Sequence, residues 1–251
     1  MHLRCLILSL VIGLSSCHKQ PRTPGICLSL DDRSVKEWYA LRSTFKEYGA
    51  HITFFVTQFD SLSPSEIQML RQLQSDGHEI ASHGALHVQA EQYIKEHSYS
   101  EYVTNEIDPG ISSMQKAGFQ PVSFAYPYGS KYWFTDYLLL KKFKTTRGVA
   151  FLKKGQSIAD LDDIFYDFDG NRKLSSLEID GQSPLSQTMI TQAMERAQGK
   201  EEVLLLSGHQ PSDSSEAGAY SFDREVLRFI LDQAKSRRLR FYRVKDLATQ
   251  R

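Results

Sequence analysis

Three features are scarce in this 251-residue chain, and each scarcity excludes a class of protein. Lysine plus arginine and aspartate plus glutamate both total 30, so no excess positive charge attracts nucleic acid or an anionic membrane surface. Cysteine occurs only three times, which excludes a scaffold held by several disulfides. The apolar run at residues 5–14 is too short to cross a bilayer as a stable helix. We therefore expect neither a nucleic-acid partner nor a membrane-spanning segment.

The N-terminal residues indicate export. Arg4 and the apolar run 5–14 have the order and length typical of a signal sequence. The run ends in Leu14-Ser-Ser-Cys17, which resembles a bacterial lipobox, and this resemblance implies cleavage before Cys17 and lipidation of its thiol. A plain secretory signal followed by a chance cysteine is the alternative. We expect an exported bacterial lipoprotein on the periplasmic face of the envelope or on the cell surface, touching the membrane through its lipid anchor only.

The remainder of the chain has the composition of one soluble domain. Hydrophobic residues make up 41% and charged residues 24%, and the length suffices for a sizeable core. We predict a signal peptide at 1–16, a tether at 17–25 and a single domain at 26–251. With Cys5 removed and Cys17 lipidated, Cys27 is expected to pack alone as a small apolar side chain.

Apolar runs and helical patterns alternate along this domain. Strands are predicted at 26–30, 52–56, 79–81, 122–126, 145–150, 203–206 and 241–244. Helices are predicted at 35–48, from Pro64 to Gly77, at 100–117 with a break or a restart at Pro109-Gly110, at 186–198 and at 223–236. Ser63 to Glu66 has the pattern of a capping box, and the polar stretch 153–185 receives no assignment. The alternation predicts βαβ units, and about seven parallel strands in one domain predict a (β/α) barrel.

Acidic residues and histidines follow the predicted strands. Asp31-Asp32 ends the first, His83-Gly-Ala-Leu-His87 follows the third, and His209 follows the sixth. In a parallel barrel the carboxyl ends of the strands meet at one face, which is where barrel enzymes hold their catalytic groups. One carboxylate and two imidazoles can bind a divalent metal and leave a position open for water, while the second carboxylate remains available as a general base.

These motifs resemble those of the polysaccharide deacetylase family, also called the NodB-homology or carbohydrate esterase family 4. Its Thr-Phe-Asp-Asp-Gly motif corresponds to residues 29–33, and its His-Ser/Thr-x-x-His motif to residues 83–87. Its Arg-x-Pro-Tyr motif corresponds to residues 125–128, and its late histidine to His209. The similarity extends from residue 26 to about residue 248. It implies a distorted (β/α) barrel with about seven parallel strands.

The resemblance also implies a role for each site residue. Asp32, His83 and His87 would bind the metal, with Zn²⁺ favoured and Co²⁺, Mn²⁺ or Ni²⁺ as alternatives. Asp31 would be the general base and His209 the general acid, while the backbone N–H of Tyr128 would stabilise the oxyanion. Tyr126, Pro127, Tyr132 and Trp133 would form the turn and the aromatic cluster that contact the sugar.

The implied activity is metal-dependent removal of N-acetyl groups from an N-acetylglucosamine-containing polysaccharide. An O-acetyl esterase acting on glycans would use the same residues. A carbohydrate-binding protein on the same fold that has lost catalysis is a third reading. Each feature also has a purely structural interpretation: an Asp pair can cap a helix, histidines can be solvated or buried, and aromatic residues can simply pack. The joint occurrence in family order favours the metal site.

The chain departs from the family pattern at several positions. Arg33 replaces the glycine after the Asp pair, and Ala125 replaces the third motif's arginine, which in the family helps to orient the base. The residue that should orient His209 has no clear counterpart, and Asp167 and Asp169 are candidates only by location. Ser207-Gly208 before His209 is also unusual. These departures leave the polarisation of Asp31 and of His209 open.

Overall fold

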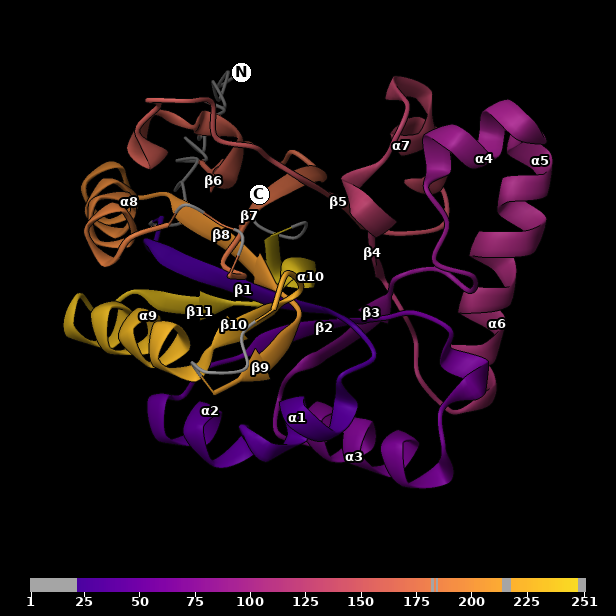
Figure 1. Cartoon of the computed structure of the whole chain (residues 1–251), viewed down its shortest axis with the longest axis horizontal. Helices are drawn as coiled ribbons and strands as arrows, with labels where there is room; N and C mark the ends of the chain where they lie inside the picture. The colour runs from indigo at the N-terminus through magenta and orange to yellow at the C-terminus, as the bar shows by residue number, and fades with distance from the viewer. Residues whose placement is uncertain (1–21, 182, 184, 214–217, 248–251) are drawn as a thin grey trace, which may run out of the picture.

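The computed structural model of the chain describes residues 22–181, 183, 185–213 and 218–247 (Figure 1). The predicted signal peptide 1–16, Cys17 and most of the tether 17–25 lie outside these residues. The last tether residues join the domain, because the carbonyl of Pro24 accepts a hydrogen bond from the N–H of Arg240 (3.0 Å). Within the described ranges, no helix combines the length and the apolar character needed to cross a membrane.

Seven parallel strands of the described residues close into a barrel, with the helices packed outside it (Figure 1). In ring order the strands are β1 (Gly25–Asp32), β2 (Ile52–Val56), β3 (Glu79–Ser82), β4 (Ser123–Ala125), β5 (Thr145–Val149), β7 (Lys173–Glu178) and β8 (Val203–Gly208). The ring closes because β8 pairs with β1, from Gly25 opposite Val203 to Leu30 opposite Gly208. The predicted distorted (β/α) barrel is thereby confirmed.

One of the seven ring strands differs from the prediction. The segment predicted at 241–244 is β11 (Arg240–Tyr242), which pairs only with the first three residues of β1 and stays outside the ring. The missing ring strand is β7, inside the stretch that received no assignment. Its sequence is hard to recognise because Ser176 faces a polar partner, the hydroxyl of Ser207 on β8 (2.8 Å). The remaining strands are β6 (Phe165–Tyr166), antiparallel to β8, and the pair β9 (Gln210–Ser212) and β10 (Ser221–Asp223).

Helices occupy the connections between the strands. They are α1 (Val35–Ala40), α2 (Arg42–Tyr48), α3 (Pro64–Ser75), α4 (Ala90–Glu96), α5 (Tyr99–Tyr102), α6 (Asp108–Lys116), α7 (Trp133–Leu139), α8 (Gln187–Lys200), α9 (Arg224–Ser236) and α10 (Val244–Leu247). The single helix predicted at 35–48 is two helices that meet at Leu41. The capping box at the start of α3 is confirmed, since Ser63 and Glu66 each bond the other's backbone N–H. The irregularity predicted near Pro109 corresponds to the start of α6 at Asp108, with Pro109 in its first turn, and a π-helical turn, Val103–Ile107, joins α5 to α6 without interrupting the helix.

Apolar side chains fill two layers. The outer layer lies between the strands and the helices and includes Trp38, Phe54, Leu70 and Ile230, all fully buried. The inner layer fills the barrel with side chains such as Phe55, Ala81 and Leu205, and it includes Cys27, which is buried and free as expected. Because side chains of a strand alternate between its two faces, Asp31 points to the same side of β1 as Cys27. The outer layer packs the helices onto the barrel. The inner layer lies inside the barrel, beneath the functional groups at the carboxyl ends of the strands.

Candidate functional site

The predicted metal, acid and base residues meet at the carboxyl ends of the barrel strands. A cleft of about 290 Å³ lies there. It is lined by Asp31, Asp32, His83, His87, Tyr126, Tyr128, Gly129, Arg147, Val149, Glu178, His209 and Tyr220. A wider surface groove of about 790 Å³ lies between α3 and α6, but it contains none of the predicted site residues. The chemistry therefore concentrates in the smaller cleft.

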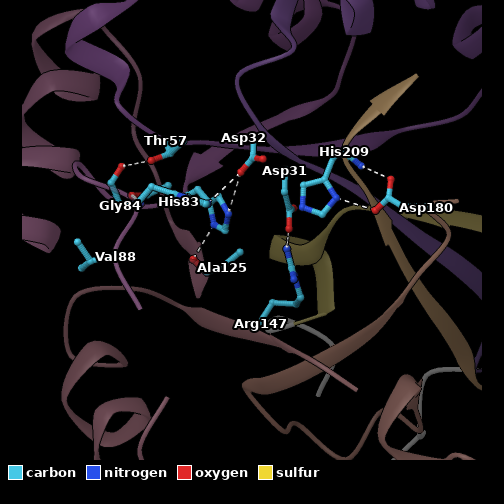
Figure 2. A network of polar contacts seen from close by, with 12 residues as sticks. Asp31, Asp32, Thr57, His83, Gly84, Val88, Ala125, Arg147, Asp180 and His209 are labelled. Atoms are coloured by element: carbon cyan, nitrogen blue, oxygen red, sulfur yellow. Dashed lines mark hydrogen bonds and ion pairs between the residues drawn. The ribbon is translucent and has the colours of Figure 1, made fainter. Parts of the chain in front are cut away.

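Three potential metal ligands, Asp32, His83 and His87, face one another in this cleft. Figure 2 shows Asp32 and His83 pointing toward each other. Oδ1 of Asp32 lies 3.0 Å from Nε2 of His87 and 3.5 Å from Nε2 of His83. The ligand atoms of all three residues lie within 4.8 Å of one another. Oδ1 of Asp32 is buried, yet it makes no well-formed hydrogen bond to any described residue. An orphaned carboxylate oxygen facing two imidazole nitrogens is the donor set that a divalent ion requires, so these residues fit a metal.

A hydrogen bond at Nδ1 holds the His83 ring so that its Nε2 faces Asp32. Its Nδ1 lies 2.9 Å from the carbonyl oxygen of Ala125, the first residue of the third motif. A bond of this kind fixes the tautomer and the orientation of a metal-binding imidazole. Burial favours the neutral acid of Asp32, but the two imidazoles outweigh it and hold the pKa of Asp32 far below its ordinary value. The carboxylate is therefore ready to bind a cation.

Asp31, the predicted general base, pairs with an arginine that comes from a different strand than the motif arginine replaced by Ala125. Asp31 is buried and forms an ion pair with the guanidinium of Arg147, which is only 1% exposed (Figure 2). Arg147 comes from β5, so it takes over the position next to Asp31 that Ala125 on β4 cannot fill. Arg147 was not predicted as a site residue, although an arginine within the predicted strand 145–150 is a signal that could have identified it. The other carboxylate oxygen of Asp31, Oδ1, is buried without a partner among the described residues.

Asp180 orients the imidazole of His209. Its carboxylate lies 2.6 Å from Nδ1 of His209 and accepts a second hydrogen bond from the backbone N–H of the same residue (3.1 Å). Burial alone would lower the pKa of His209, but the bond to Asp180 and the nearby charge of Asp31 outweigh it and raise this pKa to about 9. The candidates Asp167 and Asp169 are therefore wrong. They bond successive backbone N–H groups of their own loop, and Asp180 was hidden because β7 had not been recognised.

Tyr128, the predicted oxyanion donor, lies at the cleft. It lines the cleft with a left-handed backbone (φ 58°), and no described residue accepts a hydrogen bond from its N–H. Its ring lies 4.8 Å from that of His87. Pro127 begins the tight turn Pro127–Gly129 that contains Tyr128.

The predicted sugar-contacting aromatic residues lie in different environments. Tyr126 is fully buried and donates its hydroxyl hydrogen bond to Asp136 (3.1 Å), so its ring has no exposed face. Trp133 is 88% exposed, whereas Tyr132 stacks on Phe134 with ring centroids 5.5 Å apart. Neither Tyr132 nor Trp133 lines the cleft itself. Both remain predicted contacts for sugars outside the cleft.

Three further residues define the surroundings of the site. Glu178, at the end of β7, lines the cleft, and burial raises its pKa. Tyr220 lines it too, with its ring 5.4 Å from that of His209. Arg33 turns away, donating a hydrogen bond to Oε1 of Gln58 (2.9 Å), so its replacement of the motif glycine does not fill the cleft.

Comparison with known proteins gives a consistent picture. A family model described as "Polysaccharide deacetylase" matches residues 18–144, just over half of the chain. No curated protein matches the chain. Many solved structures share the fold, and three of them are described below. The peptidoglycan deacetylase PdaC from Bacillus subtilis is 17% identical, with a TM-score of 0.54 over 91% of each chain.

The second is the Xyl-CE4 domain of a multidomain xylanase from the hindgut metagenome of Trinervitermes trinervoides. It is 15% identical, with a TM-score of 0.53, over 90% of this chain and 89% of that one. The third is a mutant of BA3943, described as a CE4 family pseudoenzyme with restored enzymatic activity. It is 12% identical, with a TM-score of 0.60, over 92% of this chain and 70% of that one.

Proposed function

The chain belongs to the polysaccharide deacetylase family, and on that premise we propose that it is a metal-dependent hydrolase removing N-acetyl groups from an N-acetylglucosamine-containing polysaccharide. One observation carries the proposal. Oδ1 of Asp32 and the Nε2 atoms of His83 and His87 converge in a cleft that also contains a buried carboxylate, Asp31, and an oriented imidazole, His209. Amide hydrolysis needs these groups together.

The residues divide the work as follows. Asp32, His83 and His87 would hold the ion. A divalent metal bound there supplies Lewis acidity to the amide carbonyl and lowers the pKa of water. Oδ1 of Asp31, which has no partner among the described residues, takes the proton of the attacking water as its oxygen bonds to the carbonyl carbon. The N–H of Tyr128 donates a hydrogen bond to the carbonyl oxygen as negative charge develops.

The leaving group requires a proton. Nδ1 of His209 bonds to Asp180, which leaves its Nε2–H available, and the raised pKa keeps the ring protonated at neutral pH. His209 donates this proton to the amine nitrogen as the carbon–nitrogen bond breaks, giving acetate and a free sugar amine. Arg147 holds the carboxylate of Asp31 in place through their buried ion pair.

An acetate assay tests this proposal. The purified protein is stripped with a chelator and reloaded with Zn²⁺, Co²⁺, Mn²⁺ or Ni²⁺, and released acetate is measured on N-acetylated chitooligosaccharides and on acetylated xylan. We expect zinc-restored release from the chitooligosaccharides alone. Release from acetylated xylan alone would establish the O-acetyl esterase. Absence of release with every ion, from a folded protein, would favour the inactive carbohydrate-binding protein.

We also propose that the protein works on the cell envelope, tethered by a lipid on Cys17. The support is the lipobox-like sequence Leu14-Ser-Ser-Cys17 behind an apolar run. When cells that express the protein are fractionated, we expect the native chain in the membrane fraction and the Cys17→Ala variant in the soluble fraction. A native chain that is already soluble would point to the plain secretory signal.

A further inference from the structure

The backbone N–H groups of the loop that carries His87 all bond to a single residue outside the proposed ligand set. Its residues 85–88 have four consecutive backbone N–H groups, and all four donate to Glu106. The carboxylate accepts from Leu86 (2.5 Å), from His87 (3.1 Å) and from Val88 (3.3 Å). The carbonyl oxygen of Glu106 accepts from Ala85 (3.0 Å). No other described residue receives a hydrogen bond from these N–H groups.

Glu106 itself is fixed by an unusual backbone. It lies in the π-helical turn Val103–Ile107, which inserts an extra residue between α5 and α6, and its side chain is fully buried. Such turns are rare and concentrate at functional sites. Its carboxylate occupies space that a side chain at position 84 would need. A Cβ added to Gly84 would lie 2.0 Å from Oε1 of Glu106.

That contact accounts for a departure within the second motif. The family pattern has Ser or Thr after the first histidine, whereas this chain has Gly84. Gly84 also has a left-handed backbone (φ 82°), which glycine adopts at little cost. Glycine and the buried carboxylate thus go together: removing the side chain at position 84 makes room for Glu106.

His87 needs such support because its own backbone is strained. Its φ of 63° lies in the left-handed region, which residues other than glycine adopt uncommonly and at a cost in free energy. The loop gains this conformation from its bonds to Glu106. We propose that Glu106 is a positioning residue that holds His87 in its metal-binding conformation, so that the metal affinity of the site depends on a carboxylate that is not a ligand. This inference rests on the proposed metal site.

Zn²⁺ affinity distinguishes a positioning role of Glu106 from a purely structural one, because a purely structural role would leave the affinity of the folded protein unchanged. Glu106→Gln keeps the size of the side chain but replaces one accepting oxygen with an NH₂ group. This group is a donor and cannot accept hydrogen bonds from the N–H groups of the loop. The matched control is Glu79→Gln at the opposite end of the barrel. Glu79 is equally buried and accepts three hydrogen bonds, from Thr53, Ser123 and the N–H of Lys245 (2.9, 2.7 and 2.9 Å). Zn²⁺ binding to the full-length chain is measured by chelator competition, with circular dichroism and thermal unfolding of each metal-free variant alongside.

We expect Glu106→Gln to bind Zn²⁺ about 10- to 100-fold more weakly than the native chain, as found when groups that orient metal ligands are removed. Glu106→Asp should recover part of this loss, and Glu79→Gln should bind Zn²⁺ like the native chain. Equal zinc affinity of Glu106→Gln and the native chain would overturn the inference. So would an equal loss in Glu79→Gln, since the effect would then be general destabilisation.

A second variant covers the case in which Glu106→Gln does not fold. Gly110, on α6, packs against the same loop, and a Cβ there would lie 3.3 Å from the N of Ala85. Gly110→Ala therefore presses on the loop while leaving the carboxylate in place, and we expect a smaller but measurable loss of Zn²⁺ affinity. Unchanged affinity in that variant would overturn the inference. A native chain that does not bind Zn²⁺ at all would instead refute the proposed metal site.

Discussion

The two ends of the barrel both bury carboxylates, and they differ in how those carboxylates are satisfied. At the amino end, both carboxylate oxygens of Glu79 accept hydrogen bonds. The bond from the backbone N–H of Lys245 connects α10 to the barrel. At the carboxyl end, Asp31 has one oxygen on Arg147, whereas its Oδ1, like Oδ1 of Asp32, is buried and without a hydrogen bond among the described residues. A buried polar atom without a partner is costly. The unsatisfied end is the one at which we propose that metal, water and substrate bind.

The strongest way to break this comparison is to neutralise one carboxylate at each end. Asp31→Asn should lower the rate of acetate release by about 10²–10⁴-fold, because an amide cannot act as the general base. Bound zinc, measured by elemental analysis, should stay at the native level. Glu79→Gln should keep native activity and lose about 1–3 kcal/mol of stability, since one buried donor is left unpaired. Equal loss of activity in both variants would contradict the functional contrast between the ends.

Removing the partner of each carboxylate sharpens the contrast. Arg147→Met leaves Asp31 buried without its cation, which we expect to lower the free energy of unfolding by about 3–5 kcal/mol and to suppress acetate release. Ser123→Ala at the other end removes only one of three donors to Glu79 and should cost about 1–3 kcal/mol without loss of activity. Urea unfolding followed by circular dichroism measures both. Arg147→Met with native stability would show that the ion pair does not support the site.

The pH dependence of activity tests the acid at the catalytic end. A group with a raised pKa keeps its proton up to that pKa, so His209 should remain an acid until the pH approaches 9. Asp180→Asn removes the carboxylate that raises this pKa. The alkaline limb of kcat/KM should then move from about 9 toward or below the ordinary histidine value of about 6.5. An alkaline limb that stays in place in Asp180→Asn would assign it to another group, with Glu178→Gln as the next variant to measure.

The smallest expected effect concerns the residues that the sequence suggested in place of Asp180. Asp167→Asn and Asp169→Asn alter only an exposed loop whose turns an asparagine side chain can also make. Both variants should retain the native rate and the native pH profile in the acetate assay. A shifted alkaline limb in either one would return it to the list of residues that orient His209.

The parts of the fold that follow from local chemistry could be predicted. Continuous apolar runs identified β1 and β2, and the Ser63–Glu66 capping box placed the start of α3. The barrel topology then brought Asp32, His83 and His87 to one face, as strand ends in a parallel barrel must. The runs, the capping box and each motif consist of residues near one another in the sequence, and the alternation of strands and helices then predicts how the motifs meet.

The parts that depend on distant contacts could not. β7 reads Lys-Leu-Ser-Ser-Leu-Glu, which has no continuous apolar run, and only its pairing with β5 and β8 makes it a strand. Arg147 and Asp180 act through partners 116 and 29 residues away, so no local spacing connects them with Asp31 and His209. Glu106 was likewise invisible, because its partners are backbone N–H groups, which leave no mark in a sequence.

The central claim is that Asp32, His83 and His87 bind one divalent ion beside Asp31. A crystal structure of the zinc-loaded protein, with anomalous scattering measured at the zinc edge, tests it most directly. We expect a single strong peak in contact with Oδ1 of Asp32 and with Nε2 of both histidines. Absence of a peak at this position in zinc-loaded crystals, or a peak held by other residues, would contradict the account.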